Sequence, residues 1–114
     1  MSDSAPDSAL RLIFCTAPEA AAPALARTLL EARLIGCANL LGGTRSLYWW
    51  EGAIQDESET LMLMECPVEH CAAAVEALSA AHPYDVPKIL VLAPEQVNAP
   101  YLDWLRQVAP TQPG

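Results

Sequence analysis

Residues 45–64 read RSLYWWEGAIQDESETLMLM, and this stretch decides the fold. An extended segment ends in the aromatic run Tyr48-Trp49-Trp50, and the pair Glu51-Gly52 then turns the chain. Residues 54–64 resume as an alternating segment that ends in four apolar residues. Two extended segments joined by a short turn that contains glycine predict an antiparallel hairpin with long arms.

The aromatic residues of this hairpin need to be buried against something. Side chains alternate between the two faces of a strand, so Tyr48 and Trp50 point one way and Trp49 points the other. A long hairpin that shows tryptophan to water on both faces is an aggregation hazard. We therefore expect one face to pack on a neighbouring subunit. Base stacking on single-stranded nucleic acid is the alternative, but it needs a basic groove, and the flanking residues are acidic.

The segments on either side complete the order β-α-β-β-α-β with a terminal helix. The first expected elements are a strand over residues 10–16 that its run Ile13-Phe14-Cys15 places inside the sheet, a helix over 19–34 that stops at Gly36, and a strand over 37–50 with a bulge or sharp bend at Gly42-Gly43. They are followed by a helix from Pro67 to His82 with an amphipathic stripe of Val68, Cys71, Val75, Leu78 and His82, a strand over 87–94 and a helix over 99–108. This order predicts an α+β ferredoxin-like sandwich with two helices on one face of the sheet. The other face needs a cover, either the terminal helix or another subunit.

A chain of 114 residues suits a single domain. We expect a disordered tail over residues 1–8, one domain over residues 9–109 and a second tail over residues 110–114. Hydrophobic residues make up 53% of the chain, whereas charged residues make up only 18%. Few charges are available to coat a monomer, which favours a second buried surface and therefore an oligomer.

Charge and motifs exclude several classes of function. A formal net charge of −8, with 6 basic residues scattered along the chain, argues against nucleic-acid binding. Neither a secretory signal nor a membrane-spanning run is visible, so we expect a cytoplasmic protein whose four cysteines are free thiols. The sequence motifs of hydrolases, kinases and dinucleotide-binding enzymes are absent, so we expect neither an enzymatic reaction nor an organic cofactor.

Thiols and imidazoles supply the candidate metal ligands. Cys15 ends the first strand and His82 ends the second helix, and a ferredoxin-like fold can bring the two together. This pair of side chains favours copper or zinc over calcium or magnesium. The alternative is a buried thiol and a helix-terminal histidine that bind no metal. Cys66, His70 and Cys71 form a second candidate cluster.

These residues resemble the CutA family of divalent-ion tolerance proteins. The resemblance covers residues 10–107 and rests on pieces that stand in the family's order, namely Cys15-Thr16-Ala17-Pro18, Cys37-Ala38-Asn39-Leu40, Ser46-Leu47-Tyr48-Trp49-Trp50-Glu51-Gly52, His82-Pro83-Tyr84-Asp85-Val86-Pro87 and Tyr101-Leu102-Asp103-Trp104. The resemblance implies a ferredoxin-like subunit, similar to the PII signalling proteins, in a tight cytoplasmic homotrimer. It also implies a link to copper tolerance and no established reaction.

The resemblance also implies site residues. In bacterial members copper binding is associated with a cysteine before the T-A-P piece and with a pair of histidines before P-Y. Cys15 carries over onto the cysteine and His82 onto the second histidine, while Ala81 stands in the place of the first. Glu65-Cys66 stands where the family often has Lys-Thr, which replaces a cation with an anion.

Three hypotheses follow. The leading one is a homotrimeric, non-enzymatic protein that binds copper or a similar divalent metal through Cys15 and His82 and contributes to metal tolerance. The second is a signalling module of the PII type that holds a small ligand in clefts between subunits, lined by Asn39, Tyr48, Trp50, Glu59, Tyr84 and Trp104. The third is a scaffold that docks a protein partner through its surface.

Overall fold

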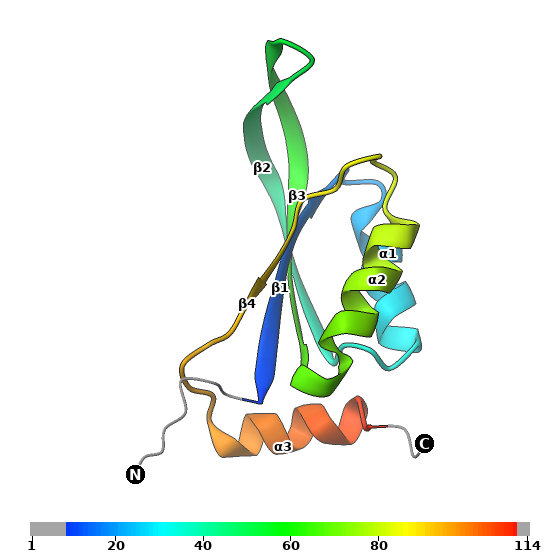
Figure 1. Cartoon of the computed structure of the whole chain (residues 1–114), viewed down its shortest axis with the longest axis vertical. Helices are drawn as coiled ribbons and strands as arrows, with labels where there is room; N and C mark the ends of the chain where they lie inside the picture. Colours follow the sequence, from blue (N-terminus) through cyan, green and yellow to red (C-terminus); the bar gives the residue numbers. More distant parts are fainter. Residues whose placement is uncertain (1–8, 112–114) are drawn as a thin grey trace.

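The computed structural model describes residues 9–111, and its strands and α-helices follow the predicted order (Figure 1). The predicted tail over residues 1–8 and the last three residues of the predicted tail 110–114 lie outside the described residues. The elements are β1 (Leu10–Ala17), α1 (Ala22–Glu31), β2 (Cys37–Trp50), β3 (Ala53–Pro67), the short 3-10 helix η1 (Val68–His70), α2 (Cys71–Ala81), β4 (Ile89–Leu92) and α3 (Ala99–Val108). The bounds of α3 are the predicted ones.

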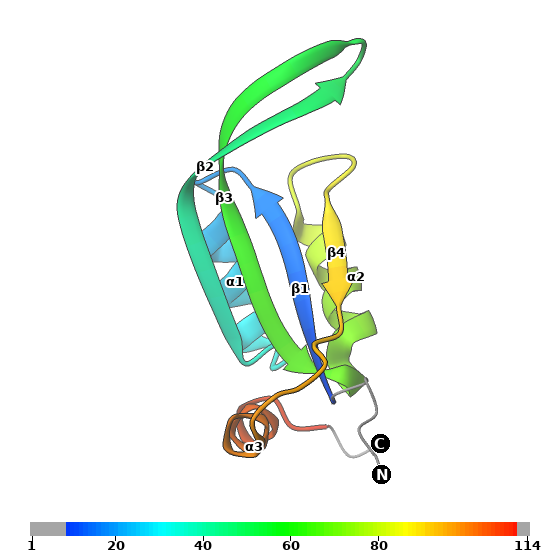
Figure 2. The same cartoon turned by 90° about the vertical axis from the view of Figure 1, so that its left-hand side faces the viewer.

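The four strands form one antiparallel sheet in the order β2-β3-β1-β4. The strand β1 lies inside this sheet, as its apolar run predicts, because it pairs with β3 on one side and with β4 on the other. The helices α1 and α2 cover one face of the sheet, and α3 lies across one end (Figures 1 and 2). The predicted α+β ferredoxin-like sandwich is confirmed.

The hydrophobic core lies between the sheet and the first two helices. Alternate side chains of β1 and β3 face the helices and are fully buried, among them Ile13, Met62 and Met64. The helices contribute Leu29 from α1 and Leu78 from α2. Burying each side chain of this size contributes about 1.5–3 kcal/mol. Cys15 of β1 belongs to the same buried layer.

The hairpin of β2 and β3 is built as predicted. Trp50 pairs with Ala53 across the two-residue turn Glu51-Gly52, and both turn residues have positive φ, 50° and 80°. Turns of this kind match the right-handed twist of the strands that they join. The predicted bulge is present, because the pairing register shifts between Leu41 and Thr44. Gly43 lies in that interval with φ 74°, a conformation that glycine adopts without strain.

The helix α1 is shorter than predicted at both ends. It begins at Ala22, so Pro23 falls in the first turn, where its missing N–H costs nothing. It ends at Glu31, and Arg33 takes the left-handed conformation with φ 60° that glycine usually supplies at a helix end. The prediction that Gly36 stops this helix is wrong. A Cβ at Gly36 would lie 2.4 Å from Cδ1 of Leu105 and 3.0 Å from Cγ2 of Val108, so glycine lets α3 pack closely there without moving these side chains.

The start of the second helical segment also differs from the prediction. Pro67 is the last residue of β3 and has an extended backbone, ψ 147°, so it does not occupy the first helical position. A 3-10 turn follows before α2 begins at Cys71. Val68 lies in that turn and is exposed, so it does not belong to the buried stripe. The strand β4 spans only Ile89–Leu92, because the predicted ends at residues 87–88 and 93–94 do not pair with β1.

The sheet face opposite α1 and α2 is apolar and largely uncovered. The registers place a row of apolar side chains on it, with Phe14 next to Leu63 on one side and Leu90 on the other. Leu41, Leu90 and Leu92 are about half exposed, at 48%, 49% and 46%. Figure 2 shows that α3 crosses below this open face and leaves its centre bare. The sequence allows two covers for this face, the terminal helix or another subunit. The terminal helix does not cover its centre.

Candidate functional site

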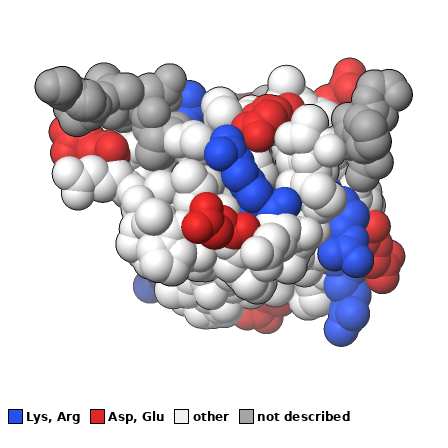
Figure 3. All heavy atoms as spheres, turned by 90° about the horizontal axis from the view of Figure 1, so that it is seen from below, with Lys and Arg blue, Asp and Glu red and all other residues white. Residues whose placement is uncertain are grey.

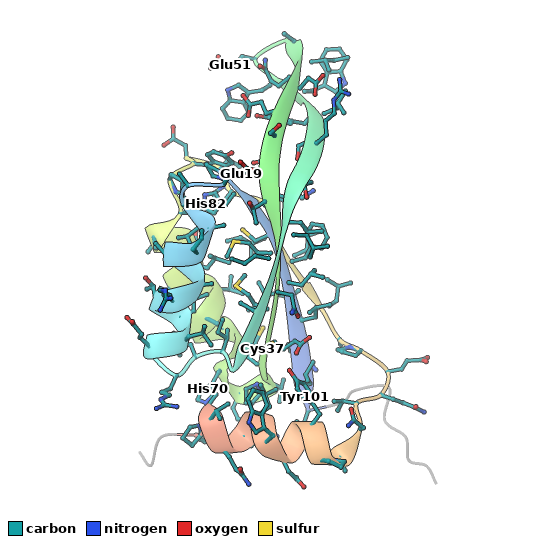
Figure 4. The ribbon with its side chains drawn as sticks, turned by 180° about the vertical axis from the view of Figure 1, so that it is seen from behind. Glu19, Cys37, Glu51, His70, His82 and Tyr101 are labelled. Carbon is teal, nitrogen blue, oxygen red and sulfur yellow. The ribbon has the colours of Figure 1, made fainter. Side chains whose placement is uncertain are left out.

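Cys15 and His82 meet at one backbone atom, the carbonyl oxygen of Thr16. The Cys15 Sγ donates a hydrogen bond to this oxygen at 3.5 Å, and Nε2 of His82 lies 2.9 Å from the same oxygen. Both side chains are buried near the ends of β1 and α2, and Figure 4 shows where His82 lies. The fold therefore brings together the two residues that the sequence singles out as metal ligands.

The hydrogen bonds of His82 define which ring nitrogen carries the proton. Its Nδ1 accepts a hydrogen bond from the backbone N–H of Tyr84 at 3.1 Å, so this nitrogen carries no proton. The proton is then on Nε2, which donates it to Thr16. A metal ion bound at Nε2 would shift that proton to Nδ1 and break the bond from Tyr84. Metal binding at this nitrogen would therefore be coupled to the loop that follows α2.

The thiol of Cys15 is held in its protonated form. Burial, with a smaller contribution from the negative charge of Glu59, raises the pKa of this thiol to about 11, and the nearby Lys88 only partly opposes the shift. The thiolate is the form that binds metal and attacks electrophiles. At neutral pH this cysteine therefore presents a hydrogen-bond donor, and metal binding must remove its proton.

We expect Cys15 to resist alkylation in the folded protein. It is fully buried, and with a pKa of about 11 only about one thiol in a thousand is ionised at pH 8. Cys71 at the start of α2 is partly exposed and serves as the internal reference. Peptide mapping by mass spectrometry after iodoacetamide at pH 8 is expected to find Cys71 modified well before Cys15, and both modified in denaturant. Equal rates in the native protein would contradict this assignment.

A groove lies between the hairpin and the segment that follows α2. It has a volume of about 680 Å³ and brings together four of the predicted cleft residues, Tyr48, Trp50, Glu59 and Tyr84. The sheet contributes its floor through Phe14 and other residues of the open face. The groove therefore lies on the opposite side of β1 from the buried Cys15.

Two tyrosine–carboxylate hydrogen bonds order this groove. Tyr48 donates its hydroxyl to Oε1 of Glu57 at 2.7 Å, and Tyr84 donates to Oε2 of Glu59 at 2.6 Å. Glu59 is only 3% exposed. Burial, and after it the hydrogen bond to Glu59, raises the pKa of Tyr84, so that hydroxyl keeps its proton. Tyr84 also packs its ring against His82, with centroids 4.8 Å apart, and so touches both parts of the candidate site.

The other two predicted cleft residues lie elsewhere. Asn39 pairs with Leu63 near the opposite end of the sheet, and Trp104 stacks on Tyr101 in α3. Figure 4 shows Cys37 and Tyr101 at this end, far from His82. Glu65 is there too, and its carboxylate accepts a hydrogen bond from the Tyr101 hydroxyl. The structure of one chain therefore does not bring Asn39 and Trp104 to the groove.

Sequence reasoning overlooked Glu57 and the carbonyl of Thr16. Glu57 bonds to its diagonal cross-strand neighbour Tyr48, since Tyr48 pairs with Gln55. The spacing of two between Glu57 and Glu59 places them on the same face and is a usable signal. No sequence pattern marks the Thr16 carbonyl as part of a site, because every residue has a backbone carbonyl.

In the second candidate cluster, Cys66, His70 and Cys71, the hydrogen bonds direct His70 away from the two cysteines. His70 turns towards α3, where Nε2 lies 3.0 Å from the carbonyl oxygens of both Ala109 and Pro110. Cys66 is buried and hydrogen-bonded to Cys71, and burial is the main reason that its pKa rises to about 12. Within residues 9–111 no group of three or more histidine, cysteine, aspartate or glutamate side chains is arranged to hold a metal ion.

Comparison with known proteins identifies the family. The family model described as CutA1 divalent ion tolerance protein matches residues 11–108. The chain belongs to this family. The divalent-cation tolerance protein CutA of Pectobacterium atrosepticum is 46% identical over 95 residues, which cover 82% of this chain and 86% of that protein.

Solved CutA structures share the fold. CutA from Xylella fastidiosa superposes with a TM-score of 0.86 at 32% identity, covering 90% of this chain and 99% of the other. The protein from Archaeoglobus fulgidus, named the periplasmic divalent cation tolerance protein CutA, gives 0.83 at 31% identity, covering 88% and 98%. The chain is therefore a CutA protein in family and in fold, which is the PII-like arrangement. None of its helices within the described residues has the length and apolar character needed to cross a membrane.

Proposed function

We propose that this protein is a homotrimeric, non-enzymatic divalent-cation tolerance protein that binds copper or a similar metal ion through Cys15 and His82. The observation that carries the proposal is that this thiol and this imidazole converge on the Thr16 carbonyl oxygen. Sulfur and imidazole nitrogen are ligands that copper and zinc prefer. Ala81 supplies no third ligand, so the proposal assigns the remaining positions to water or to a neighbouring oxygen.

The open face of the sheet supports the homotrimer. The row of apolar side chains around Phe14, Leu63 and Leu90 is larger than scattered exposed residues on a monomer would explain. The exposed aromatic residues of the hairpin add to it, with Trp49 71% exposed in the single chain. A further copy of the chain carries the same surface and is the simplest cover.

Two further features support a cytoplasmic location and the proposed partners. All four cysteines are free thiols in the described residues, which suits the reducing cytoplasm. On the face seen from below, basic and acidic side chains are interspersed and no continuous basic area is visible (Figure 3), which supports a partner other than nucleic acid. The proposed partners are therefore copies of the same chain and a metal ion.

The expected result for Cys15→Ala and His82→Ala is a loss of copper affinity of about 100-fold or more, because even partners outside the ligand shell typically contribute 10–100-fold. Isothermal titration calorimetry of the full chain measures it. The matched controls are Cys37→Ala and His70→Ala, which remove the same groups elsewhere. Binding to the double variant at wild-type affinity would exclude this site.

The same site predicts a pH dependence. Because the Cys15 thiol has a pKa of about 11 and binds metal as thiolate, each bound ion releases one proton. The apparent affinity is therefore expected to rise about tenfold per pH unit between roughly pH 6 and 9. The ultraviolet charge-transfer band between thiolate and metal, followed with cadmium as the probe, reports this titration. A pH-independent affinity would show that Cys15 is not a ligand.

The groove of about 680 Å³ is the observation that supports a second proposed function. Four predicted cleft residues line it, and two of its tyrosines are fixed by carboxylates, which is typical of a preformed small-molecule site. This supports a signalling role of the PII type in which a small ligand binds in a cleft that this groove forms with a neighbouring subunit.

A further inference from the structure

Two of the cysteines lie in contact with each other on the helix side of the sheet. Cys66 lies near the end of β3, belongs to the hydrophobic core and is fully buried. Cys71 is the first residue of α2, packs against the same core and remains partly exposed. The two side chains are hydrogen-bonded to each other, and both are free thiols. The fold therefore places a buried thiol directly beside an accessible one.

The turn between these two cysteines is held by the backbone at both ends. Pro67 pairs with Leu10 in the sheet, and the N–H of Val68 donates a hydrogen bond to the carbonyl oxygen of Ala9 at 2.8 Å. At the other end, the N–H of Cys71 bonds to the carbonyl oxygen of Val68 and closes the 3-10 turn η1. Because these bonds fix the backbone next to both sulfur atoms, the contact between the thiols is built into the fold.

This pair lies away from the surface that is proposed to join copies of the chain. Cys66 belongs to the core between the sheet and the first two helices, whereas Leu63 and Phe14 lie on the open face. Figure 2 shows α2 behind the sheet when the open face is in front. An assembly through the open face therefore does not itself cover Cys71.

The turn between the cysteines also anchors the end of α3. The carboxylate of Glu69 accepts a hydrogen bond from Arg106 at 3.2 Å. Nε2 of His70 lies 3.0 Å from the carbonyl oxygens of both Ala109 and Pro110. A bond between the two sulfur atoms would close a ring that contains the whole of η1, with both of these anchoring side chains on it. Chemistry at the thiol pair therefore acts on the segment that holds α3.

We propose that Cys66 and Cys71 form a redox-active dithiol, which a hydroperoxide converts into an intramolecular disulfide that encloses η1. With hydrogen peroxide, the sulfur of Cys71 attacks one oxygen, the O–O bond breaks, and a sulfenic acid forms while water leaves with the thiol proton. The sulfur of Cys66 then attacks the sulfur of Cys71, the S–O bond breaks, and a second water leaves with the second thiol proton. The two thiols are oxidised, and the peroxide is reduced to water.

The exposure of the two thiols assigns their order of reaction. Of this pair only Cys71 is accessible to solvent, so it meets the oxidant first. Cys66 is fully buried, and burial is the main reason that its pKa rises to about 12, so it does not attack an external oxidant. Its target is the sulfenic acid that forms beside it, which is the role of a resolving cysteine. The dithiol uses neither Cys15 nor His82 and is independent of the proposed metal site.

The test is peptide mapping by mass spectrometry of the full chain after treatment with hydrogen peroxide. A glutamate-specific protease cuts after Glu65, Glu69 and Glu76, so it separates the two cysteines into peptides 66–69 and 70–76. The expected result is a disulfide-linked pair of these peptides, which dithiothreitol separates again. Cys37→Ser removes the other partly exposed thiol and is the matched control, expected to form the same linked pair.

Two variants test the separate roles of the thiols. Cys66→Ala is expected to leave Cys71 as a sulfenic acid that dimedone captures, because no resolving thiol remains beside it. Cys71→Ser is expected to leave Cys66 reduced under the same treatment. Hydrogen–deuterium exchange at residues 105–109 is expected to change when the wild type is oxidised and to stay the same when Cys71→Ser is treated.

Defined outcomes contradict the proposal. Conversion of Cys71 to sulfinic acid with Cys66 still free in the wild type would show that the buried thiol does not resolve the sulfenic acid. Linkage only between two chains, detected as a doubled mass without reductant, would also overturn the intramolecular disulfide. Oxidation of Cys66 in the Cys71→Ser variant would refute the order of reaction, and unchanged exchange at the end of α3 in the oxidised wild type would refute the action on its anchor.

Discussion

Leu90→Glu is expected to convert the proposed homotrimer into monomers. Leu90 lies in β4, pairs with Phe14 and points from the open face of the sheet. It is 49% exposed in the single chain, so a glutamate there meets water in the monomer and does not disturb its core. In an assembly that covers this face, the same carboxylate loses its water without gaining a partner, at a cost of several kcal/mol.

The expected effect is large because two free-energy terms weaken the association. Burial of a leucine contributes about 1.5–3 kcal/mol, which the variant gives up before the carboxylate penalty is added. Self-association is therefore expected to weaken by about 100-fold or more, since each 1.4 kcal/mol is tenfold. Size-exclusion chromatography with light scattering at micromolar concentration measures the change in mass.

Val91→Glu is the matched control for this experiment. Val91 is the next residue of the same strand and is 47% exposed, but it pairs with Ile13 and points to the opposite face. The control is expected to remain an oligomer. If Leu90→Glu also keeps the mass of the wild type, the open face is not the surface through which the chains associate.

Leu78→Ala is expected to lower the stability of each chain by about 2–5 kcal/mol. Leu78 is fully buried in α2 and packs in the layer that joins the helices to the sheet, so its truncation leaves a cavity that rigid neighbours cannot fill. For a domain of this size the melting temperature is expected to fall by roughly 10 °C or more.

Thermal unfolding of Leu78→Ala is best compared with Leu78→Met at the same site. Methionine conserves the volume, so its cost is expected to stay below about 1.5 kcal/mol. All proteins are measured at one concentration, because association stabilises the folded chain by mass action. A melting temperature for Leu78→Ala within a degree or two of wild type would mean that α2 does not anchor the sheet.

The parts of the fold that local rules control were predictable. The turn at Glu51-Gly52, the bulge beside Gly43 and the bounds of α3 each follow from residues within a few positions. The errors came where tertiary contacts outweigh local preference. Gly36 reads as a helix stop, but a distant side chain of α3 is what requires it. Pro67 suits a helix start, yet pairing with Leu10 keeps it in the sheet.

The candidate site was predictable only as far as its side chains. Residue types indicated Cys15 and His82, and the fold explains their approach. The sequence pattern could not show that both bond to one carbonyl oxygen or that the histidine already uses both nitrogens. The sequence pattern also could not show that Asn39 and Trp104 lie away from the groove. An aromatic or amide residue gives the same signal at either end of the sheet.

Tyr84 has a consequence for the thermodynamics of the whole molecule. Its backbone N–H bonds to the ring of His82, and its hydroxyl bonds to the carboxylate of Glu59. A change of partner at one end of this residue therefore alters the free energy at the other. Under the two proposed functions, occupancy on the two sides of β1 would be heterotropically linked, and linkage requires that each ligand change the affinity for the other by the same factor. A single tyrosine in the loop after α2 would then make metal-ion concentration a variable in small-molecule binding.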